Sequence, residues 1–209
     1  MPYLEMPPTK SSLRKIREEL TFAYEGYDLL NQKREVLVME IMRRMSDLRR
    51  LESETEGSLK SLYRAYGLAA VDMGSRDLAL KSSAEKRSYF LRIGTTRFMG
   101  LRLPEMTITE KKPLVAPNLP GTSASYDKAK EEAVRALRLL AEYAALSRTI
   151  ILLSRELTKV QRRVNALEKI FIPQHEEAKT YIAGRLEEME REEVFVKKLI
   201  RRRQEEAGS

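Results

Sequence analysis

LRKIREELTFAYEGYDLL, residues 13–30, has the spacing on which the predicted fold depends. Its apolar side chains recur alternately after three and four residues, which is typical of a helix packed against a second helix. This spacing continues to residue 65, about seven heptads, whereas three or four already indicate a coiled coil. Thr9, Ser11 or Ser12 can cap the start of this helix. Twelve of the sixteen positions on the repeating face, the seam, are apolar. The predicted seam consists of Leu13, Ile16, Leu20, Ala23, Tyr27, Leu30, Arg34, Leu37, Ile41, Arg44, Leu48, Leu51, Thr55, Ser58, Leu62 and Ala65.

A second long helix is predicted over residues 122–206, beginning near Ser123 or Ser125. Pro173 interrupts it, and a proline inside a helix removes a backbone donor at a cost of about 3 kcal/mol or more. We expect Pro173 to bend this helix, to shift its apolar stripe and to lie opposite the first half of the first helix. The predicted seam consists of Ala136, Leu140, Tyr143, Ser147, Ile150, Leu153, Leu157, Val160, Val164, Leu167, Phe171, Ala178, Ile182, Met189 and Val196.

The residues between the two helices have a different composition, with frequent glycine and proline. Their pattern predicts a short helix within residues 75–86, a β-hairpin within residues 89–109 and an extended linker over residues 110–123. Gly67 is a plausible end of the first helix, because glycine commonly follows the last helical residue.

Two amphipathic helices of this length need partners, and the simplest partner for each is the other. The predicted fold is mainly α: a long antiparallel two-helix coiled coil with a small module containing a β-hairpin between the helices. The expected parts are a first helix over 9–67, a middle module over 68–121 and a second helix over 122–206, in one elongated domain. Both chain ends would then meet at one tip.

The composition excludes several classes of enzyme and metal protein. The 209 residues include no cysteine and one histidine, so disulfides, thiolate metal sites and histidine-based nucleophile relays are not expected. There is no glycine-rich phosphate loop, and we expect no catalytic residue, cofactor or metal. The acidic run 186–193 is interpreted as a solvated helix face, and His175 as a surface or kink residue. No stretch has the apolar length of a membrane span or a signal peptide.

Basic residues gather near both ends of the chain, which carries a net charge of +8. Three interpretations remain open: solvated helix ends, a surface for an acidic partner and a nucleic-acid surface. The last lacks an aromatic stacking platform or a groove-reading motif. The candidate partner contacts are Lys10, Arg14, Lys15, Arg17, Lys197, Lys198, Arg201, Arg202 and Arg203.

Several stretches resemble one protein family over nearly the whole chain. They are PTKSSLRKIREELTFAYEGYDLLNQKREVLVMEI near the start, FMGLRLP in the middle, and RRVNALEKIFIP with YIAGRLEEMEREEVFVKKLIRR near the end. Together they resemble the D subunit of the archaeal and vacuolar-type rotary ATPases and ATP synthases. The most specific motif residues near the end are Arg162, Arg163, Val164, Asn165, Ala166, Leu167, Glu168 and Pro173.

The resemblance implies a central rotor shaft without catalytic activity of its own. It implies partners: the catalytic A and B subunits, the F subunit of the rotor, and the C (or d) subunit that connects to the membrane ring. It also implies a peripheral position at the cytoplasmic side of the membrane. The alternatives from the residues alone are a static coiled-coil adaptor and a basic helical nucleic-acid-binding protein.

Overall fold

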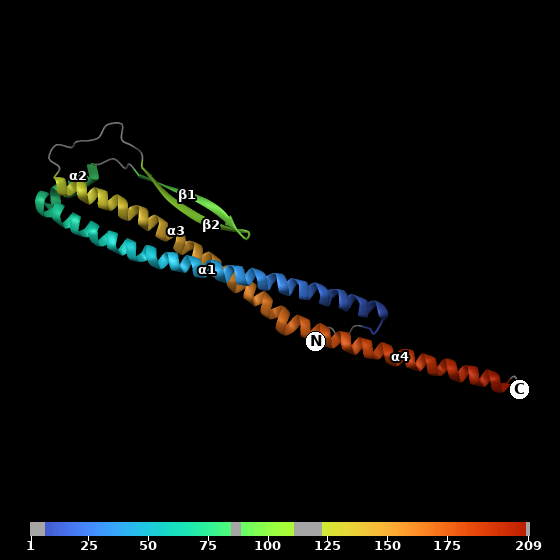
Figure 1. Ribbon diagram of the computed structural model, residues 1–209. Helices are drawn as coiled ribbons and strands as arrows, with labels where there is room; N and C mark the ends of the chain where they lie inside the picture. The colour runs from blue at the N-terminus through green and yellow to red at the C-terminus, as the bar shows by residue number, and fades with distance from the viewer. Residues whose placement is uncertain (1–6, 85–88, 111–122, 208–209) are drawn as a thin grey trace. The chain divides into compact units, whose positions relative to one another are not determined.

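The structure, a computed structural model, describes residues 7–84, 89–110 and 123–207. Two long helical stretches enclose a two-stranded antiparallel sheet in chain order, which confirms the predicted fold class. The remaining residues, including most of the predicted linker, lie outside the described part. Figure 1 shows the elements α1 (Lys10–Met73), α2 (Ser75–Ala84), β1 (Tyr89–Phe98), β2 (Leu101–Glu110), α3 (Ala124–Ala166), the π-helix η2 (Leu167–Phe171) and α4 (Ile172–Ala207).

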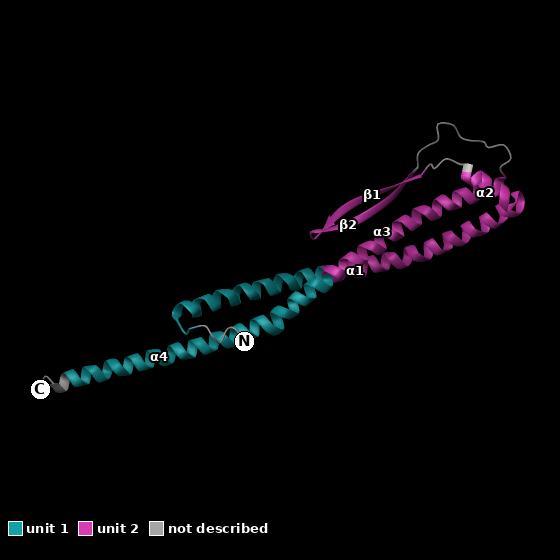
Figure 2. Cartoon of the chain, turned by 180° about the vertical axis from the view of Figure 1, so that it is seen from behind, with its two compact units in different colours: residues 1–36, 157–209 teal, residues 37–156 magenta. Residues whose placement is uncertain are grey.

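The chain divides into two compact units, coloured separately in Figure 2. Unit 1 contains residues 1–36 and 157–209, and unit 2 contains residues 37–156. In both units a part of α1 lies beside the helix that follows the hairpin in sequence. The middle module therefore belongs to the same compact unit as most of α1 and α3.

Interhelical contacts show that the helices of unit 1 run antiparallel. Lys10 lies 2.8 Å from Glu190, and the Tyr24 hydroxyl donates to Glu176 at 2.5 Å. Residue numbers therefore rise along α1 while they fall along α4. Pro173 is close to these contacts in sequence, so its predicted position opposite the first half of the first helix is confirmed.

Hydroxyl side chains cap the start of both long helices. The Thr9 hydroxyl accepts the backbone N–H of Ser12 at 3.1 Å, and the Ser123 hydroxyl accepts that of Tyr126 at 3.3 Å. Each cap satisfies one of the backbone donors that a helix start leaves without an intrahelical partner. Thr9 and Ser123 were both among the predicted caps.

The predicted end of the first helix at Gly67 is wrong, because α1 continues to Met73. Gly67 has no atom within 4 Å of the place where a Cβ would lie, so a helical glycine is tolerated there. Gly74 instead has φ +80°, and its N–H donates to the carbonyl of Ala70. A left-handed glycine after the last turn is the usual way to end a helix.

Burial confirms the predicted seam of α1, since all sixteen positions are buried or half-buried. The seam of the second helix contains three errors: Leu140, Met189 and Val196 are exposed. At the first of these positions Ala141, the next residue, is buried instead. The other two lie where α4 reaches or passes the start of α1, so no part of α1 is available to cover them.

The two units have separate groups of buried residues. In unit 1 the group comprises Ile16, Leu20, Ala23, Ile172, Ala178 and Ile182. In unit 2 one group comprises Ala65, Ala69, Leu78, Tyr126 and Ala129. The second group joins α2 to the end of α1 and to the start of α3, so the short helix of the middle module is packed against both long helices.

The hairpin has a two-residue turn and a ten-residue antiparallel register from Tyr89↔Glu110 to Phe98↔Leu101. The turn residues Met99 and Gly100 have φ angles of 47° and 84°. Positive φ at both central residues matches the right-handed twist of the flanking strands. Leu103 is almost fully buried at 1 % exposure, so this side chain packs one face of the hairpin onto the unit.

Pro173 is the second residue after η2, the π-helix between α3 and α4. The N–H of Ile172 donates to the carbonyl of Leu167, five residues back. The carbonyl of Glu168 thus receives no bond from Ile172, and Pro173 has no N–H to donate. Because the π-helical turn is wider than an α-helical one, the helix continues past the residue that lacks an N–H donor. The same turn changes which face of α4 is directed toward α1.

Candidate functional site

The last part of α4 is an exposed helix. All residues from 187 to 204, here called the C-terminal arm, are exposed, whereas Ile182 is still buried. Because Lys10 at the start of α1 lies beside Glu190, the arm extends past the end of its partner helix. Its exposed apolar side chains are Met189, Val194, Phe195, Val196, Leu199 and Ile200.

The arm has two chemically different faces. Phe195 and Leu199 are four residues apart, as are Val196 and Ile200, so these pairs form one apolar face. At about 100° per residue, Lys197 and Arg201 lie on the opposite side, Lys198 and Arg202 flank the apolar face at its Phe195 edge, and Arg203 falls within the apolar face. A helix with this pattern can bind a partner that offers an apolar surface and acidic groups.

One ion pair within the arm reduces its free positive charge. Lys197 lies 2.6 Å from Glu193, and this hydrogen bond lowers the pKa of the Glu193 carboxyl. Both side chains are largely exposed, so the pair exchanges easily with water or with a partner.

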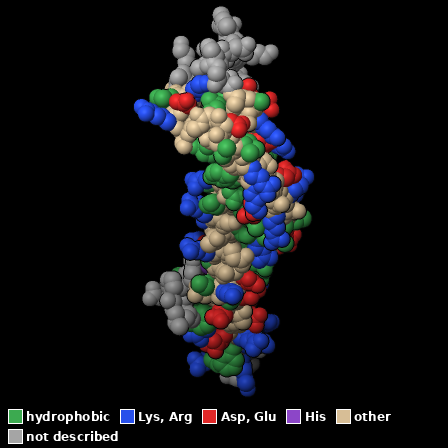
Figure 3. Space-filling view, turned by 90° about the vertical axis from the view of Figure 1, so that its left-hand side faces the viewer, with side chains coloured by type: hydrophobic (Ala, Val, Ile, Leu, Met, Phe, Trp, Pro, Cys, Tyr) green, Lys and Arg blue, Asp and Glu red, His purple; other side chains and the backbone are tan. Residues whose placement is uncertain are grey.

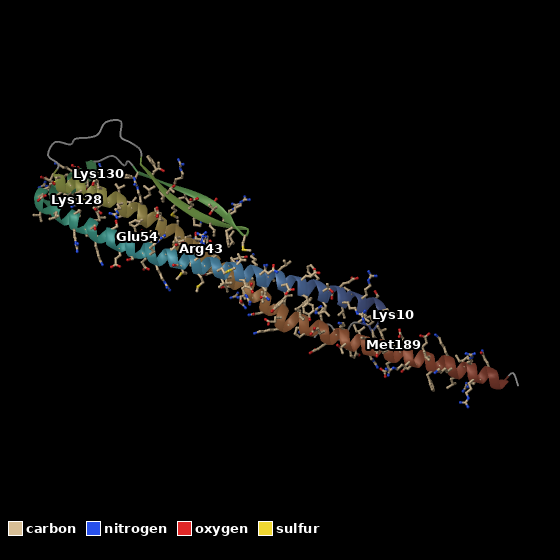
Figure 4. The ribbon with its side chains drawn as sticks, in the orientation of Figure 1. Lys10, Arg43, Glu54, Lys128, Lys130 and Met189 are labelled. Atoms are coloured by element: carbon tan, nitrogen blue, oxygen red, sulfur yellow. The ribbon has the colours of Figure 1, made fainter. Side chains whose placement is uncertain are left out.

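The predicted basic residues at the start of α1 are engaged in ion pairs. Lys10 pairs with Glu190 on α4, and this hydrogen bond raises the pKa of Lys10. Arg14 donates to Glu18 at 2.8 Å, which raises the pKa of the guanidinium. In Figure 4 the labelled Lys10 and Met189 lie near each other, on facing helices of unit 1.

The two predicted basic groups lie at the same end of unit 1, where acidic side chains of α4 lie between them. Lys15 lies 4.0 Å from Glu19, and Arg17 lines a shallow groove against α4. Arg203 is thirteen residues beyond Glu190, about 20 Å along α4 at 1.5 Å per residue. Arg203 is therefore distant from the start of α1, whereas Lys197 pairs with Glu193, whose pKa is lowered by Lys197 and also by Lys10.

The motif residues divide between the interior and the surface of unit 1. Val164 is fully buried and Leu167 is half-buried, whereas Arg162, Arg163, Ala166 and Glu168 are exposed. The half-buried Asn165 accepts a hydrogen bond from Gln161. Pro173, also half-buried, follows the π-helix.

His175 was predicted to be a surface or kink residue; the surface position is wrong, because its side chain is fully buried, and the residue lies four positions after the end of the π-helix. Its Nδ1 lies 2.8 Å from the carbonyl oxygen of Phe171, and its ring stacks on the Phe171 ring with centroids 3.8 Å apart. Its Nε2 lies 3.4 Å from the carboxylate of Glu19 on α1. The seven-residue gap in the predicted seam between Phe171 and Ala178 was a signal that an intervening residue had to face α1.

Unit 2 contains two open grooves beside the hairpin. One has a volume of about 950 Å³ and is lined by residues of α1 and α3, including Glu54 and Lys130, which Figure 4 labels. The other, of about 650 Å³, lies between α1, α3 and the hairpin and contains Arg43, Arg44 and Leu103. Both linings mix acidic and basic side chains, which does not favour an anionic or a cationic small molecule.

Metal-ligand clusters and helices able to span a membrane are both absent from the described part of the chain. Within residues 7–84, 89–110 and 123–207 no group of three or more His, Asp or Glu side chains could hold a metal ion. Among these same residues, no helix combines the length and the hydropathy that crossing a membrane requires. On the face drawn in Figure 3, Lys and Arg side chains are spread among hydrophobic and acidic ones.

Comparison with known proteins identifies the family. The family profile described as the D subunit of ATP synthase matches residues 12–202. The V-type ATP synthase D subunit of Thermotoga neapolitana is 31 % identical over 192 residues, covering 92 % of this chain and 95 % of the relative. The V-type ATP synthase D subunit numbered 2 of Treponema pallidum is 33 % identical and covers 96 % of both chains. The A-type ATP synthase D subunit of Methanosphaera stadtmanae is 32 % identical, covering 93 % of this chain and 92 % of the relative.

These matches span both long helices, the hairpin and the C-terminal arm almost to its end. The resemblance drawn from the short motifs is thereby confirmed. The chain belongs to the family of ATP synthase D subunits and is a subunit of a V/A-type ATP synthase complex.

Proposed function

We propose that this chain is the central rotor shaft of its complex. In this role it couples rotation to ATP synthesis or hydrolysis in the catalytic A and B subunits and to ion transport across the membrane. It contributes no catalytic residue and lies, without spanning the membrane, on the cytoplasmic side. The observation that supports this role best is an antiparallel helix pair in which α4 continues past α1 as the C-terminal arm.

The physical basis of coupling is the mismatch between the shaft and its collar. A pair of helices cannot have threefold symmetry, whereas the resemblance implies a threefold ring of A and B subunits. The shaft then presents a different face to each of three otherwise equivalent sites and favours a different nucleotide state in each. Such differential contacts are the only way in which one site can bias another.

The arm is the part that we assign to the collar. Its apolar face, with Phe195 and Leu199, would lie against apolar side chains, and Lys198 and Arg202 would meet acidic groups. Exposed ion pairs contribute little each and exchange readily, which suits a surface that turns. The F subunit would bind alongside the shaft, and the C (or d) subunit would connect it to the membrane ring.

Rotation can be tested by a reversible cross-link, because the natural chain has no cysteine. In a reconstituted complex, Leu199→Cys would be joined by a disulfide to a single cysteine introduced in the collar. We expect ATP hydrolysis to stop on oxidation and to recover on reduction. The reduced form of the same variant is the control, and continued hydrolysis in the fully cross-linked complex would favour a static adaptor.

The role of the basic face can be tested by neutralising Arg201, Arg202 and Arg203 together. We expect coupling between hydrolysis and ion transport to fall while assembly is retained, since apolar contacts remain. The matched control is Arg49→Ser, an exposed charge on α1 in unit 2. Unchanged coupling in the triple variant would refute the assignment.

Nucleic-acid binding is the weaker alternative and has its own test. Phosphate contacts release counterions, so such binding would weaken steeply with salt. We expect no salt-dependent binding of duplex DNA or RNA by the purified chain.

A further inference from the structure

The β-hairpin carries exposed apolar side chains on one of its two faces. Successive residues of a strand point to opposite sides, so the register of β1 and β2 sorts their side chains into two faces (Figure 1). Leu103 lies on one face and is buried. The opposite face is here called the outer face, and it consists of Leu91, Ile93, Thr95, Arg97, Arg102, Pro104, Met106 and Ile108.

Four aliphatic side chains form one patch on the outer face. Leu91 is paired with Ile108, and Ile93 is paired with Met106 in the next pair but one. The pair beside a two-residue turn exchanges backbone hydrogen bonds and the pairs then alternate, so both of these are non-hydrogen-bonded pairs with closely spaced side chains. Leu91 and Ile93 are each more than half exposed. Exposed apolar patches rimmed by polar residues are typical of interaction sites.

Two arginines stand opposite each other at the turn end of the same face. Arg97 is paired with Arg102, and like charges directly opposite each other on a sheet are destabilising. Both side chains are exposed, and among the described residues no acidic side chain pairs with either of them. A carboxylate placed between the two arginines would relieve this repulsion, because its two oxygens accept several charge-assisted hydrogen bonds at once.

We propose that the outer face binds a protein partner that offers an apolar surface beside a carboxylate. The apolar surface covers Leu91 and Ile93, and the carboxylate lies between Arg97 and Arg102. Because the chain is a subunit of a V/A-type ATP synthase, the partner belongs to the same complex. The binding does not depend on the rotor role, since a static adaptor would use this face in the same way.

The composition of the outer face favours a protein over the other possible occupants. Arginine and methionine are enriched at protein interfaces, whereas lysine, aspartate and glutamate are depleted there, and the outer face contains none of these three. Recognition of anionic lipids instead uses clusters of about four to eight basic residues. Two outer faces from copies of this chain would offer each other no carboxylate, because a twofold interface joins the same patch to itself.

The first experiment compares the accessibility of the two faces and uses the absence of natural cysteine. Ile93→Cys places a thiol on the outer face, and Arg92→Cys places one on the opposite face at an exposed position. A maleimide should label both variants in the isolated full chain. In the purified complex we expect most of the labelling of Ile93→Cys to be lost and that of Arg92→Cys to be retained. Equal labelling of Ile93→Cys in both states, or loss at both positions, would overturn the assignment of the outer face.

The second experiment tests for the carboxylate. Arg97→Lys keeps the positive charge and supplies an amine, which a carbodiimide joins to a carboxylate in direct contact. In the complex we expect the amine of Arg97→Lys to be joined to an Asp or Glu of another subunit, identified by mass spectrometry. The matched control is Arg92→Lys, on the opposite face, which should give no such product. A product within this chain alone, or equal products from both variants, would contradict the proposal.

Two measurements on the isolated full chain test the other occupants. We expect no binding to vesicles of phosphatidylcholine and phosphatidylglycerol, and a monomer in sedimentation. Binding to vesicles that Arg97→Glu abolishes would assign the face to anionic lipid, and a dimer that Ile93→Glu disperses would assign it to a second copy. Either result overturns the proposal. Protection of Ile93→Cys in a complex that still hydrolyses ATP when Leu199→Cys is cross-linked would refute the rotor role alone.

Discussion

The two units bury different kinds of side chain between their helices. The buried layer of unit 1 is built largely from branched residues such as Ile16 and Ile182, whereas unit 2 buries several alanines such as Ala69 and Ala136 beside branched residues such as Leu153. The distance between helix axes depends on the side chains at the contact, so alanine permits a closer approach. Large side chains instead bury more apolar area, at about 25 cal/mol per Å².

Unit 2 also buries hydroxyl groups in its seam, at Thr55, Ser58 and Thr149. The Thr55 hydroxyl donates to the carbonyl of Leu51 in its own helix at 2.6 Å, so it needs no partner across the seam. The comparison shows that one continuous heptad pattern can be packed in two ways, around large branched side chains or around alanines and hydroxyl-bearing residues. Unit 1 should be sensitive to lost volume, and unit 2 to added volume.

The largest effect is expected when volume is removed from unit 1. Ile182→Ala, at a position 1 % exposed, should lower the free energy of unfolding by about 2–5 kcal/mol, since the cavity adds to the lost burial. Urea denaturation measures the change. The control Leu29→Ala, on α1 at 66 % exposure, should change it by no more than about 0.5 kcal/mol. Equal effects at both positions would remove the basis of the comparison.

Added volume in unit 2 should give the next largest effect. Ala69 is fully buried, so Ala69→Leu should lower the free energy of unfolding by about 1–3 kcal/mol through overpacking. Ala144→Leu, at an exposed position of α3, is the matched control and should be nearly neutral. If Ala69→Leu were stabilising, the seam of unit 2 would contain space that close packing excludes.

Two glycines, one within α1 and one directly after it, should respond in opposite directions to alanine. Gly74→Ala should lower stability by roughly 1–2 kcal/mol, because φ +80° strains a residue with a Cβ. Gly67→Ala should raise stability by roughly 0.5–1 kcal/mol, since the position is helical and has free space. Thermal unfolding of the two variants distinguishes the signs, and a destabilising Gly67→Ala would mean that α1 does end near residue 67.

The smallest effect is expected at acidic pH, where the stability of unit 2 should depend on Glu40. In unit 2 the hydrogen bond from Arg43, with a further one from Arg44, lowers the pKa of Glu40. A lowered carboxyl pKa gives stability that is present above about pH 4.5 and is lost as pH falls below it. Glu40→Gln should therefore flatten a small acid-side loss of stability, followed by circular dichroism. An unchanged acid limb would mean that Glu40 contributes nothing.

Most of the helical pairing could be predicted from sequence because the burial pattern of a helix repeats locally. The seam from Leu13 to Ala65 was correct at every position, including the polar Thr55 and Ser58. The caps Thr9 and Ser123 were among the predicted ones, since a hydroxyl before a helix has a local partner. Prediction of the partner-contact residues depends on proteins outside this chain, so those residues stay a prediction.

The errors occur where local signals were ambiguous. Gly67 and Gly74 are equally plausible stops by residue type, and the positive φ of Gly74 distinguishes them. Met189 and Val196 continue the heptad spacing, but spacing does not reveal where the partner helix begins. His175 is buried on the shifted face of α4 after the π-helix; the gap in the apolar pattern between Phe171 and Ala178 signals that some residue there faces α1, but it does not say which one.

The sequence by itself determined two long amphipathic helices, the hairpin between them, the family and the absence of cysteine chemistry. These properties depend on residue type and on spacing within one segment. Only the tertiary structure decided how far α4 extends past α1, how Pro173 is accommodated, and that His175 meets Glu19. Those features depend on the relative register of two segments more than a hundred residues apart, which local periodicity leaves open.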